Sequence, residues 1–145
     1  MAVAGSPTMN LLKRLARSNP LTTDLGLLAL RLWFGLTMAI VHGYGKLMNL
    51  GDFSAKVAKL GLPIPSVLGP AAGLSEFLGG ILLALGLMTR LSAASLICTM
   101  SVAAFVVHAN DPFQKKELAL CYAFAAIALL LAGPGRFSAD ARWLK

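Results

Sequence analysis

The sequence predicts an all-α fold, an integral membrane four-helix bundle with a short interfacial helix between helices 1 and 2. Three observations lead to this prediction. Of the 145 residues, 57% are apolar and 13% are charged, whereas soluble domains have about 45–50% apolar and about 25% charged residues. The apolar residues gather into long runs, and most of the basic residues flank those runs. A chain of this length forms one domain.

Four apolar runs are candidates for membrane-spanning helices. A hydrocarbon core of about 30 Å needs about 20 helical residues at about 1.5 Å each, and about 17 suffice. The runs cover residues 25–44, 67–88, 91–107 and 118–132. The fourth run is short and Ala-rich, so it spans only if Lys116, Glu117 and Arg136 mark its water-facing ends. The run Gly133-Pro134-Gly135 then ends it.

Residues 1–24 are polar and basic and lack the apolar region that a cleaved signal peptide requires. We therefore expect the first apolar run to be retained, with Asp24 as its N-cap. The predicted organisation is a basic cytoplasmic N-terminal segment (1–24), a four-helix transmembrane domain (25–135) and a cytoplasmic C-terminal tail (136–145).

The segment "GDFSAKVAKLG" between the first two runs predicts a short helix on the membrane surface. Phe53, Val57 and Leu60 share one stripe, with two lysines to one side of it. Such an amphipathic helix lies at the bilayer interface, with its apolar stripe toward lipid or the rim of the bundle. We expect Asp52 to cap this helix and Gly61 to end it, before "LPIPS" breaks the chain.

The basic residues predict the orientation of the bundle. In an even-numbered bundle the N-terminus, the turn after the second run and the C-terminus share one side. That side holds seven basic residues and the other side holds five, and positive charge prefers the cytoplasm, so both termini are expected there. The seven are Lys13, Arg14, Arg17, Arg90, Arg136, Arg142 and Lys145, and the five are Lys46, Lys56, Lys59, Lys115 and Lys116.

Polar residues inside the first run form one stripe along its helix. At about 100° per residue, Arg31, Gly35, Met38 and His42 fall within an arc of roughly 60°. A charge that faced lipid would cost at least about 2.5–3.5 kcal/mol, so the stripe is expected to face the bundle interior. The opposite face is apolar or aromatic and includes Trp33, Leu36 and Ile40.

Glu76 is the one carboxylate inside the second run, "GPAAGLSEFLGGILLALGLMTR". Small residues one turn away on its own face, with Gly79 and Gly80 nearby, allow a neighbouring helix to approach closely. We expect Glu76 to face inward and to meet Arg31, or to share with it a cavity between the first two helices, with Gly35 and Gly80 providing room. Two interpretations stay open: a structural ion pair or protonated carboxyl that fixes helix register, and a ligand or proton site in a membrane cavity.

His42, Lys46 and His108 complete the candidate polar core with Arg31 and Glu76. The topology places both histidines near the outer ends of their helices, where Asp111 and Glu117 also lie. Two histidines without a third ligand of clear spacing do not make a metal site. The cysteines, Cys98 and Cys121, lie inside apolar runs without CxxC spacing, so their roles stay open.

The net charge of +7 indicates anionic lipid headgroups rather than nucleic acid, because the basic residues neither cluster nor alternate with aromatic residues. The lipid bilayer is therefore the first expected partner of this chain.

Three segments of the chain resemble the DoxX family of small four-helix membrane proteins: "RLWFGLTMAIVHGYGKL", "SEFLGGILLALGLMTRLSA" and "HANDPFQKKELALCYAFAAIALLLAGPGRFSAD". The resemblance covers about residues 25–143 and implies a multi-pass protein of a bacterial cytoplasmic (inner) membrane. The family is named after a subunit of quinone-linked thiosulfate oxidation, and distant relatives act as cargo receptors and chaperones. The family's motif positions fall here on Arg31, His42, Gly43, Lys46, Glu76, Gly79, Gly80, Thr89, Arg90 and Asp140.

The family resemblance suggests a quinone-linked or redox-associated membrane subunit. The chain carries no CxxC, CxxCH or dinucleotide motif, so a quinone or a partner redox protein would carry the electrons. Arg31 and His42 would donate to quinone carbonyls, and Glu76 would exchange the proton. The alternative is a non-catalytic membrane scaffold, chaperone or lipid-binding partner. Whether the chain is an enzyme is left open by the sequence.

Overall fold

The computed structural model describes residues 19–143, and every regular element in that range is a helix. The all-α class expected from the sequence is thereby confirmed. Residues 1–18 of the N-terminal segment expected over 1–24 lie outside the described residues. The helices are α2 (Pro20–Thr37), α3 (Tyr44–Met48), α4 (Leu50–Lys59), α5 (Pro65–Leu85), α6 (Thr89–Val102), α7 (Phe113–Ala132) and α8 (Ala139–Trp143), with π-helical segments η1 (Met38–Gly43) and η2 (Ala103–Val107).

Three helical stretches of the described chain are long and apolar enough to cross a membrane: Pro20–Met48, Pro65–Leu85 and Thr89–Val107. The first joins α2, η1 and α3, and the third joins α6 and η2. Helix α7 has 20 residues, but Lys115, Lys116 and Glu117 lie near its start. Length and composition therefore support an integral membrane protein.

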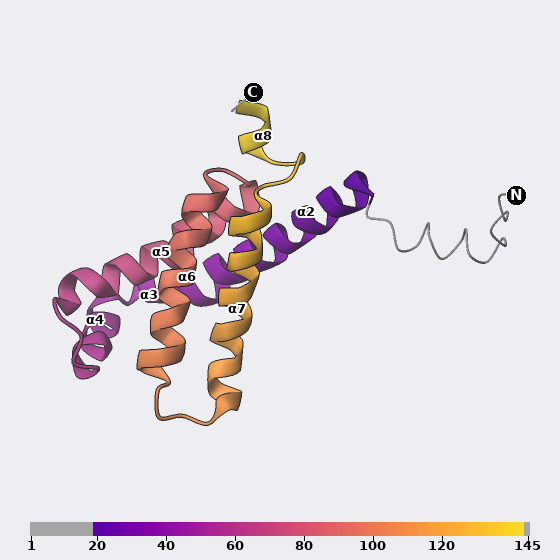
Figure 1. Ribbon diagram of the computed structural model, residues 1–145. Helices are drawn as coiled ribbons and strands as arrows, with labels where there is room; N and C mark the ends of the chain where they lie inside the picture. Colours follow the sequence, from indigo (N-terminus) through magenta and orange to yellow (C-terminus); the bar gives the residue numbers. More distant parts are fainter. Residues whose placement is uncertain (1–18, 144–145) are drawn as a thin grey trace, which may run out of the picture.

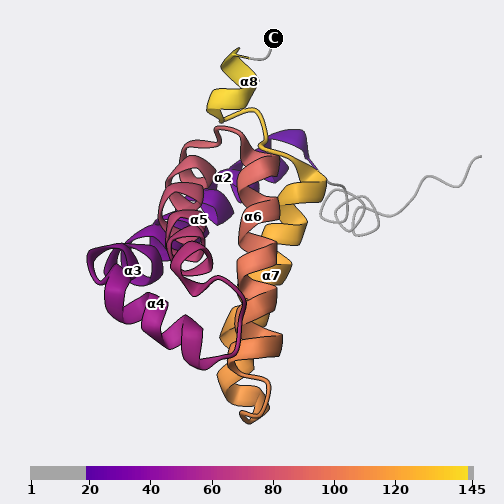
Figure 2. The ribbon, with the colours of Figure 1, turned by 90° about the vertical axis from the view of Figure 1, so that its left-hand side faces the viewer.

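The helices form two close pairs that cross obliquely (Figures 1 and 2). Helices α6 and α7 lie side by side, and α5 packs along α2 and η1. Helix α4 packs against α5, and α8 lies beyond the turn between α5 and α6. The buried apolar residues at the centre come from all four long helices and include Phe34, Met38, Leu83, Leu96, Met100 and Leu129.

Glycine allows α2 and α5 to pack with their backbones in contact. A Cβ added at Gly35 would lie 2.7 Å from the backbone nitrogen of Ala84, and one added at Gly80 would lie 2.7 Å from the carbonyl oxygen of Gly35. Neither position has space for a side chain unless a helix shifts. This contact fixes the level at which the two helices cross, and with it the polar residues that can meet.

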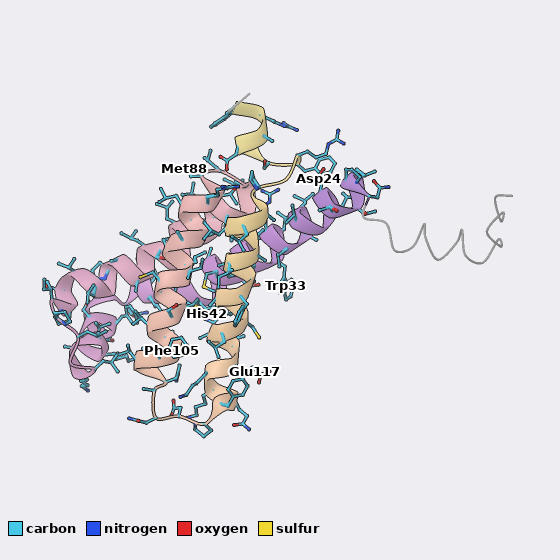
Figure 3. All side chains as sticks on the ribbon, viewed as in Figure 1. Asp24, Trp33, His42, Met88, Phe105 and Glu117 are labelled. Carbon is cyan, nitrogen blue, oxygen red and sulfur yellow. The ribbon has the colours of Figure 1, made fainter. Side chains whose placement is uncertain are left out.

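The expected inward stripe of the first helix matches the burial pattern. Arg31, Gly35 and Met38 are buried and His42 is half-buried. Trp33 is 76% exposed on the opposite side and points away from the neighbouring helices (Figure 3).

Two expected helix caps are wrong. Helix α2 begins at Pro20, where Asn19 caps it by accepting a hydrogen bond from the Leu21 N–H at 3.0 Å. Asp24 instead accepts from the Arg136 N–H at 3.0 Å, which ties the C-terminal segment to α2. Helix α4 begins at Leu50, one turn earlier than expected, and Asp52 lies in its first turn. Asparagine at position 19 is as good a cap as aspartate, so cap preference alone does not choose between them.

Helix α4 occupies the segment expected to form the short amphipathic helix. Val57 is buried, Phe53 is half-buried and Leu60 is exposed, so the centre of the stripe faces the bundle. After α4, Gly61 adopts φ +71°, and α5 starts at Pro65.

Candidate functional site

The buried carboxylate of Glu76 pairs with Lys46. Glu76 lies on α5 and its side chain is 1% exposed, while the Lys46 side chain on α3 is 30% exposed. Lys46 Nζ lies 2.5 Å from Oε1 and 2.6 Å from Oε2 of Glu76. Both oxygen atoms of the carboxylate thus accept a charge-assisted hydrogen bond inside the apolar bundle.

Close packing around Gly43 and Gly73 brings Lys46 to Glu76. A Cβ on Gly43 would overlap the backbone of Phe77, and a Cβ on Gly73 would lie 3.1 Å from Leu47 and 3.6 Å from Lys46. The end of η1 and the start of α3 therefore lie directly on the turn of α5 that carries Glu76.

Phe53 of α4 contributes an aromatic contact to the same lysine. Its ring centroid lies 5.1 Å from Lys46 Nζ, within the range of a cation–π interaction. The sequence had assigned Phe53 only to the apolar stripe of the short helix. In the structure it links α4 to the ion pair.

His42 extends the site toward α7. It lies one helical turn before Lys46 and directly precedes Gly43, which packs against the α5 backbone at Glu76 and Phe77. Its ring meets Tyr122 edge-on with centroids 5.4 Å apart, and Tyr122 stacks on Phe34 at 5.5 Å. Sequence reasoning missed Tyr122, although it is the only hydroxyl-bearing aromatic residue of the fourth apolar run.

The π-helical segment η1 contains His42. A π-helix inserts an extra residue into the helical repeat, and such segments are frequent at functional sites. Because α3 follows η1 directly, the insertion also sets the direction in which Lys46 leaves the helix.

The expected pair between Arg31 and Glu76 is wrong. Arg31 is completely buried, and its Nη2 donates to the carbonyl oxygen of Phe137 at 2.7 Å. Its guanidinium lies against Gly86 at the end of α5, roughly 15 Å along the helix from Glu76 at about 1.5 Å per residue. The sequence predicted correctly that both side chains face the interior of the bundle, but the two residues lie at different levels of it.

Asp140 connects the C-terminal segment to the turn between α5 and α6. Its carboxylate accepts from the backbone N–H groups of Met88 at 2.8 Å and Thr89 at 2.9 Å, and its own N–H donates to the Gly86 carbonyl oxygen at 2.9 Å. Burial by itself raises the pKa of Asp140, but these N–H donors and nearby Arg31 outweigh it, so the pKa lies below its ordinary value. The carboxylate also satisfies N–H groups at the start of α6.

His108 does not belong to the same cluster as His42. His108 Nδ1 lies 2.8 Å from Oδ2 of Asp111 in the loop before α7, and this hydrogen bond lowers the pKa of Asp111. His42 instead meets α7 at Tyr122, about 14 Å from the start of that helix at about 1.5 Å per residue. Figure 3 shows His42 level with the middle of α7, and Glu117 toward the loop end of that helix. The expected common face for the two histidines is therefore wrong.

Within residues 19–143 no group of three His, Cys, Asp or Glu side chains is placed to hold a metal ion. The groups that the structure does bring together are Glu76, Lys46 and His42, with Tyr122 and Phe53 beside them. These side chains can donate hydrogen bonds and exchange protons. They contain no electron carrier.

The DoxX family profile matches residues 26–109, more than half of the chain. This chain is a member of the DoxX family. The matched range runs from α2 to the loop after η2, so it contains Arg31, His42, Lys46 and Glu76. Tyr122 and Asp140 lie beyond it. No curated protein and no solved structure matches this DoxX chain.

Proposed function

We propose that this DoxX protein is a four-helix subunit of a bacterial inner membrane, with α7 as the fourth span and both termini in the cytoplasm. Helix α7 packs along the whole of α6, and its charged residues lie only in its first turns. Helix α4 would lie at the outer interface, with Val57 toward the bundle. The basic residues of the termini and of the α5–α6 turn support this orientation.

Reporter fusions test the orientation. A reporter that is active only in the cytoplasm should give signal when fused after Lys145 or in the α5–α6 turn, and none when fused in the η2–α7 loop. The reverse pattern would overturn the orientation, and equal signals from the η2–α7 loop and the C-terminus would remove α7 as a span.

We infer that the site formed by Lys46, Glu76 and His42 binds the headgroup of a quinone in a redox-linked role. The observation that carries this inference is a buried, charged pair in an apolar bundle, with one member open to the surroundings. Ionisable residues inside a membrane are commonly functional, because burying a charge in the bilayer costs free energy. The lysine partly exposed beside α4 offers an approach for a headgroup.

The chemistry of the site suits quinone carbonyls. Lys46 and His42 can donate hydrogen bonds to carbonyl oxygens, the Lys46 ammonium and a protonated His42 can supply protons, and the Glu76 carboxylate can accept the protons that replace them. Reduction of a quinone to a quinol takes up two electrons and two protons. A partner redox protein would supply the electrons, and the polar site would pass the protons. Arg31 lies too far along the helix pair to take the role expected for it at Glu76.

A non-catalytic membrane scaffold, chaperone or lipid-binding partner is the second candidate. Both oxygen atoms of Glu76 already bond to Lys46, as a purely structural pair also requires. In that role the pair fixes the register of α3 on α5 and does no chemistry.

Quinone content separates the two candidates. The wild type purified in mild detergent should yield close to one quinone per chain on solvent extraction and should bind an added short-chain quinone analogue. The double variant Lys46→Met/Glu76→Gln removes both charges together, so it should fold and yet bind the analogue at least about tenfold more weakly. Lys56→Met on exposed α4 is the matched control and should bind as the wild type does. If the double variant binds the quinone analogue as tightly as the wild type does, the quinone role is contradicted and the scaffold role is favoured.

A further inference from the structure

We propose that the groove between α2, the end of α5 and the C-terminal segment is a binding site for an anionic phospholipid. The groove has a volume of about 350 Å³ and is lined by Leu28, Leu85, Phe137, Ser138, Arg142 and Trp143, among others. It lies at the C-terminal end of α5, about 13 Å along the helix from Glu76 at about 1.5 Å per residue, and shares no residue with the Lys46–Glu76 site. The inference is therefore independent of the proposed quinone role.

The walls of this C-terminal groove suit a lipid rather than a free anion. Leu28, Leu85 and Phe137 offer apolar surface for acyl chains, and Arg142 places a guanidinium on its rim. Guanidinium groups commonly bind phosphates, because their planar array of N–H donors matches the phosphate oxygens. Trp143 is 74% exposed, and tryptophan prefers the headgroup level of a bilayer.

The position of the groove agrees with that chemistry. Two of the three candidate spans meet there, because α5 ends at Leu85 and α6 begins at Thr89. Figures 1 and 2 show α8 beyond this end of the helices. A groove at the end of apolar helices, with basic residues around it, resembles the pockets in which membrane proteins hold acidic headgroups.

The charges at this end are unbalanced toward positive. Asp24 and Asp140 use their carboxylates to accept backbone N–H groups. No ion pair joins either to an arginine in residues 19–143. The arginines of the same end are Arg31, Arg90, Arg136 and Arg142. This excess favours an acidic lipid over a zwitterionic one.

Arg31 provides a second, independent indication. It is completely buried, and neither Nε nor Nη1 has a hydrogen-bond partner. Its guanidinium and Ser138 both lie within van der Waals range of Gly86, and Ser138 also lines the groove. A buried guanidinium with free donors directly behind the groove raises the positive potential that a phosphate would meet.

Lipid retention tests this proposal. The full chain in nanodiscs or detergent is titrated with phosphatidylglycerol and with phosphatidylcholine, and bound lipid is counted by native mass spectrometry. The wild type should retain phosphatidylglycerol in preference to phosphatidylcholine. Arg142→Gln should bind the acidic lipid about fivefold more weakly, as expected for one basic residue at a membrane surface. Arg90→Gln is the matched control, because it removes the same charge from the same end without lining the groove.

Three outcomes would overturn the proposal. They are equal retention of the two lipids by the wild type, equal losses in the two variants, and displacement of the lipid by millimolar glycerol phosphate, which would indicate a free-anion site. Thermal unfolding of each variant without added lipid should match the wild type, since Arg142 and Arg90 are exposed. A Gln variant that unfolds at a lower temperature would be replaced by the Lys variant at the same position. Arg142→Lys keeps the positive charge, so it should retain phosphatidylglycerol near the wild-type level.

Discussion

The bundle buries two opposite charges, and it satisfies them in different ways. Glu76 is neutralised by one side chain, because a single ammonium group reaches both carboxylate oxygens. Arg31 has five N–H donors in a fixed fork, and its hydrogen-bond partner is the backbone carbonyl of Phe137. A carboxylate can be completed by one well-placed neighbour, whereas a guanidinium needs several. The Glu76 carboxylate is therefore paired through both of its oxygens, whereas the Arg31 guanidinium at the C-terminal end of α5 keeps unused donors.

The two ends also differ in what holds them together. Around Glu76, glycines bring η1 and α3 onto the middle of α5, so the ion pair depends on backbone contact. At the Arg31 end, the C-terminal segment folds back and closes the bundle through Phe137 and Asp140. The first contact includes the Lys46–Glu76 pair, whose residues are 30 positions apart. The second joins the C-terminal segment to residues 51 to 106 positions earlier in the chain.

Breaking the ion pair should give the largest effect, and it should be asymmetric. Lys46→Met strands a carboxylate that is 1% exposed, whereas Glu76→Gln strands a lysine whose side chain is 30% exposed. We expect Lys46→Met to lower the free energy of unfolding by about 3–5 kcal/mol, the cost of an uncompensated buried charge. Glu76→Gln should cost less, since the lysine can extend toward the interface. Denaturant unfolding in detergent measures both, and equal losses would contradict the burial difference.

Adding a methyl group at the helix contact should give the next largest effect. A Cβ at Gly43 would overlap the Phe77 backbone, so Gly43→Ala should destabilise by about 1–3 kcal/mol. Gly45→Ala is the matched control two residues away, where a Cβ meets nothing within 4 Å. That substitution should be neutral or stabilise by up to about 1 kcal/mol, because alanine favours helix. Similar losses at the two glycines would show that backbone contact does not set the crossing.

Removing the carboxylate at the other end should have a smaller effect. Asp140→Asn weakens the acceptor for the Met88 and Thr89 N–H groups and should cost about 1 kcal/mol. Asp52→Asn on exposed α4 is the matched control and should change the free energy of unfolding by less than about 0.5 kcal/mol.

The stability that Asp140 contributes should also depend on pH. Its pKa is lower in the folded protein than the ordinary value of about 3.9. The stabilisation is therefore complete above that ordinary value and is lost as the pH falls through the lower, folded-state pKa. The difference between wild type and Asp140→Asn should shrink below about pH 4. A difference that grows on acidification would contradict this sign.

Much of the fold follows from periodicity in the sequence. The apolar runs predicted the long helices, and the stripe of Arg31, Gly35, Met38 and His42 predicted the buried face of α2. Glu76 was correctly expected to face inward. The breaks at Gly61 and at Gly133 also came from local chemistry, since glycine ends helices.

The partners of the buried charges did not follow from the sequence. Periodicity assigns a residue to a face of a helix, but it does not fix the level at which two helices cross. That level is set by the glycine contacts with α5 at Gly35, Gly80 and Gly43. The contact of Gly43 with the backbone of Phe77 places Lys46 rather than Arg31 beside Glu76. The contact of Asp140 with the α5–α6 turn was also out of reach, because it joins residues 51 and 52 positions apart.

A double-mutant cycle tests most directly whether Lys46, and not Arg31, neutralises Glu76. The free energy of unfolding is measured for Glu76→Gln, Lys46→Met and Arg31→Gln, and for the two double variants that contain Glu76→Gln. With Lys46→Met the coupling should reach about 1–3 kcal/mol, because removing both charges costs less than the sum of the single changes. With Arg31→Gln the effects should add to within about 0.5 kcal/mol, as for distant sites. If Glu76→Gln couples to Arg31→Gln and is additive with Lys46→Met, then Lys46 does not neutralise Glu76.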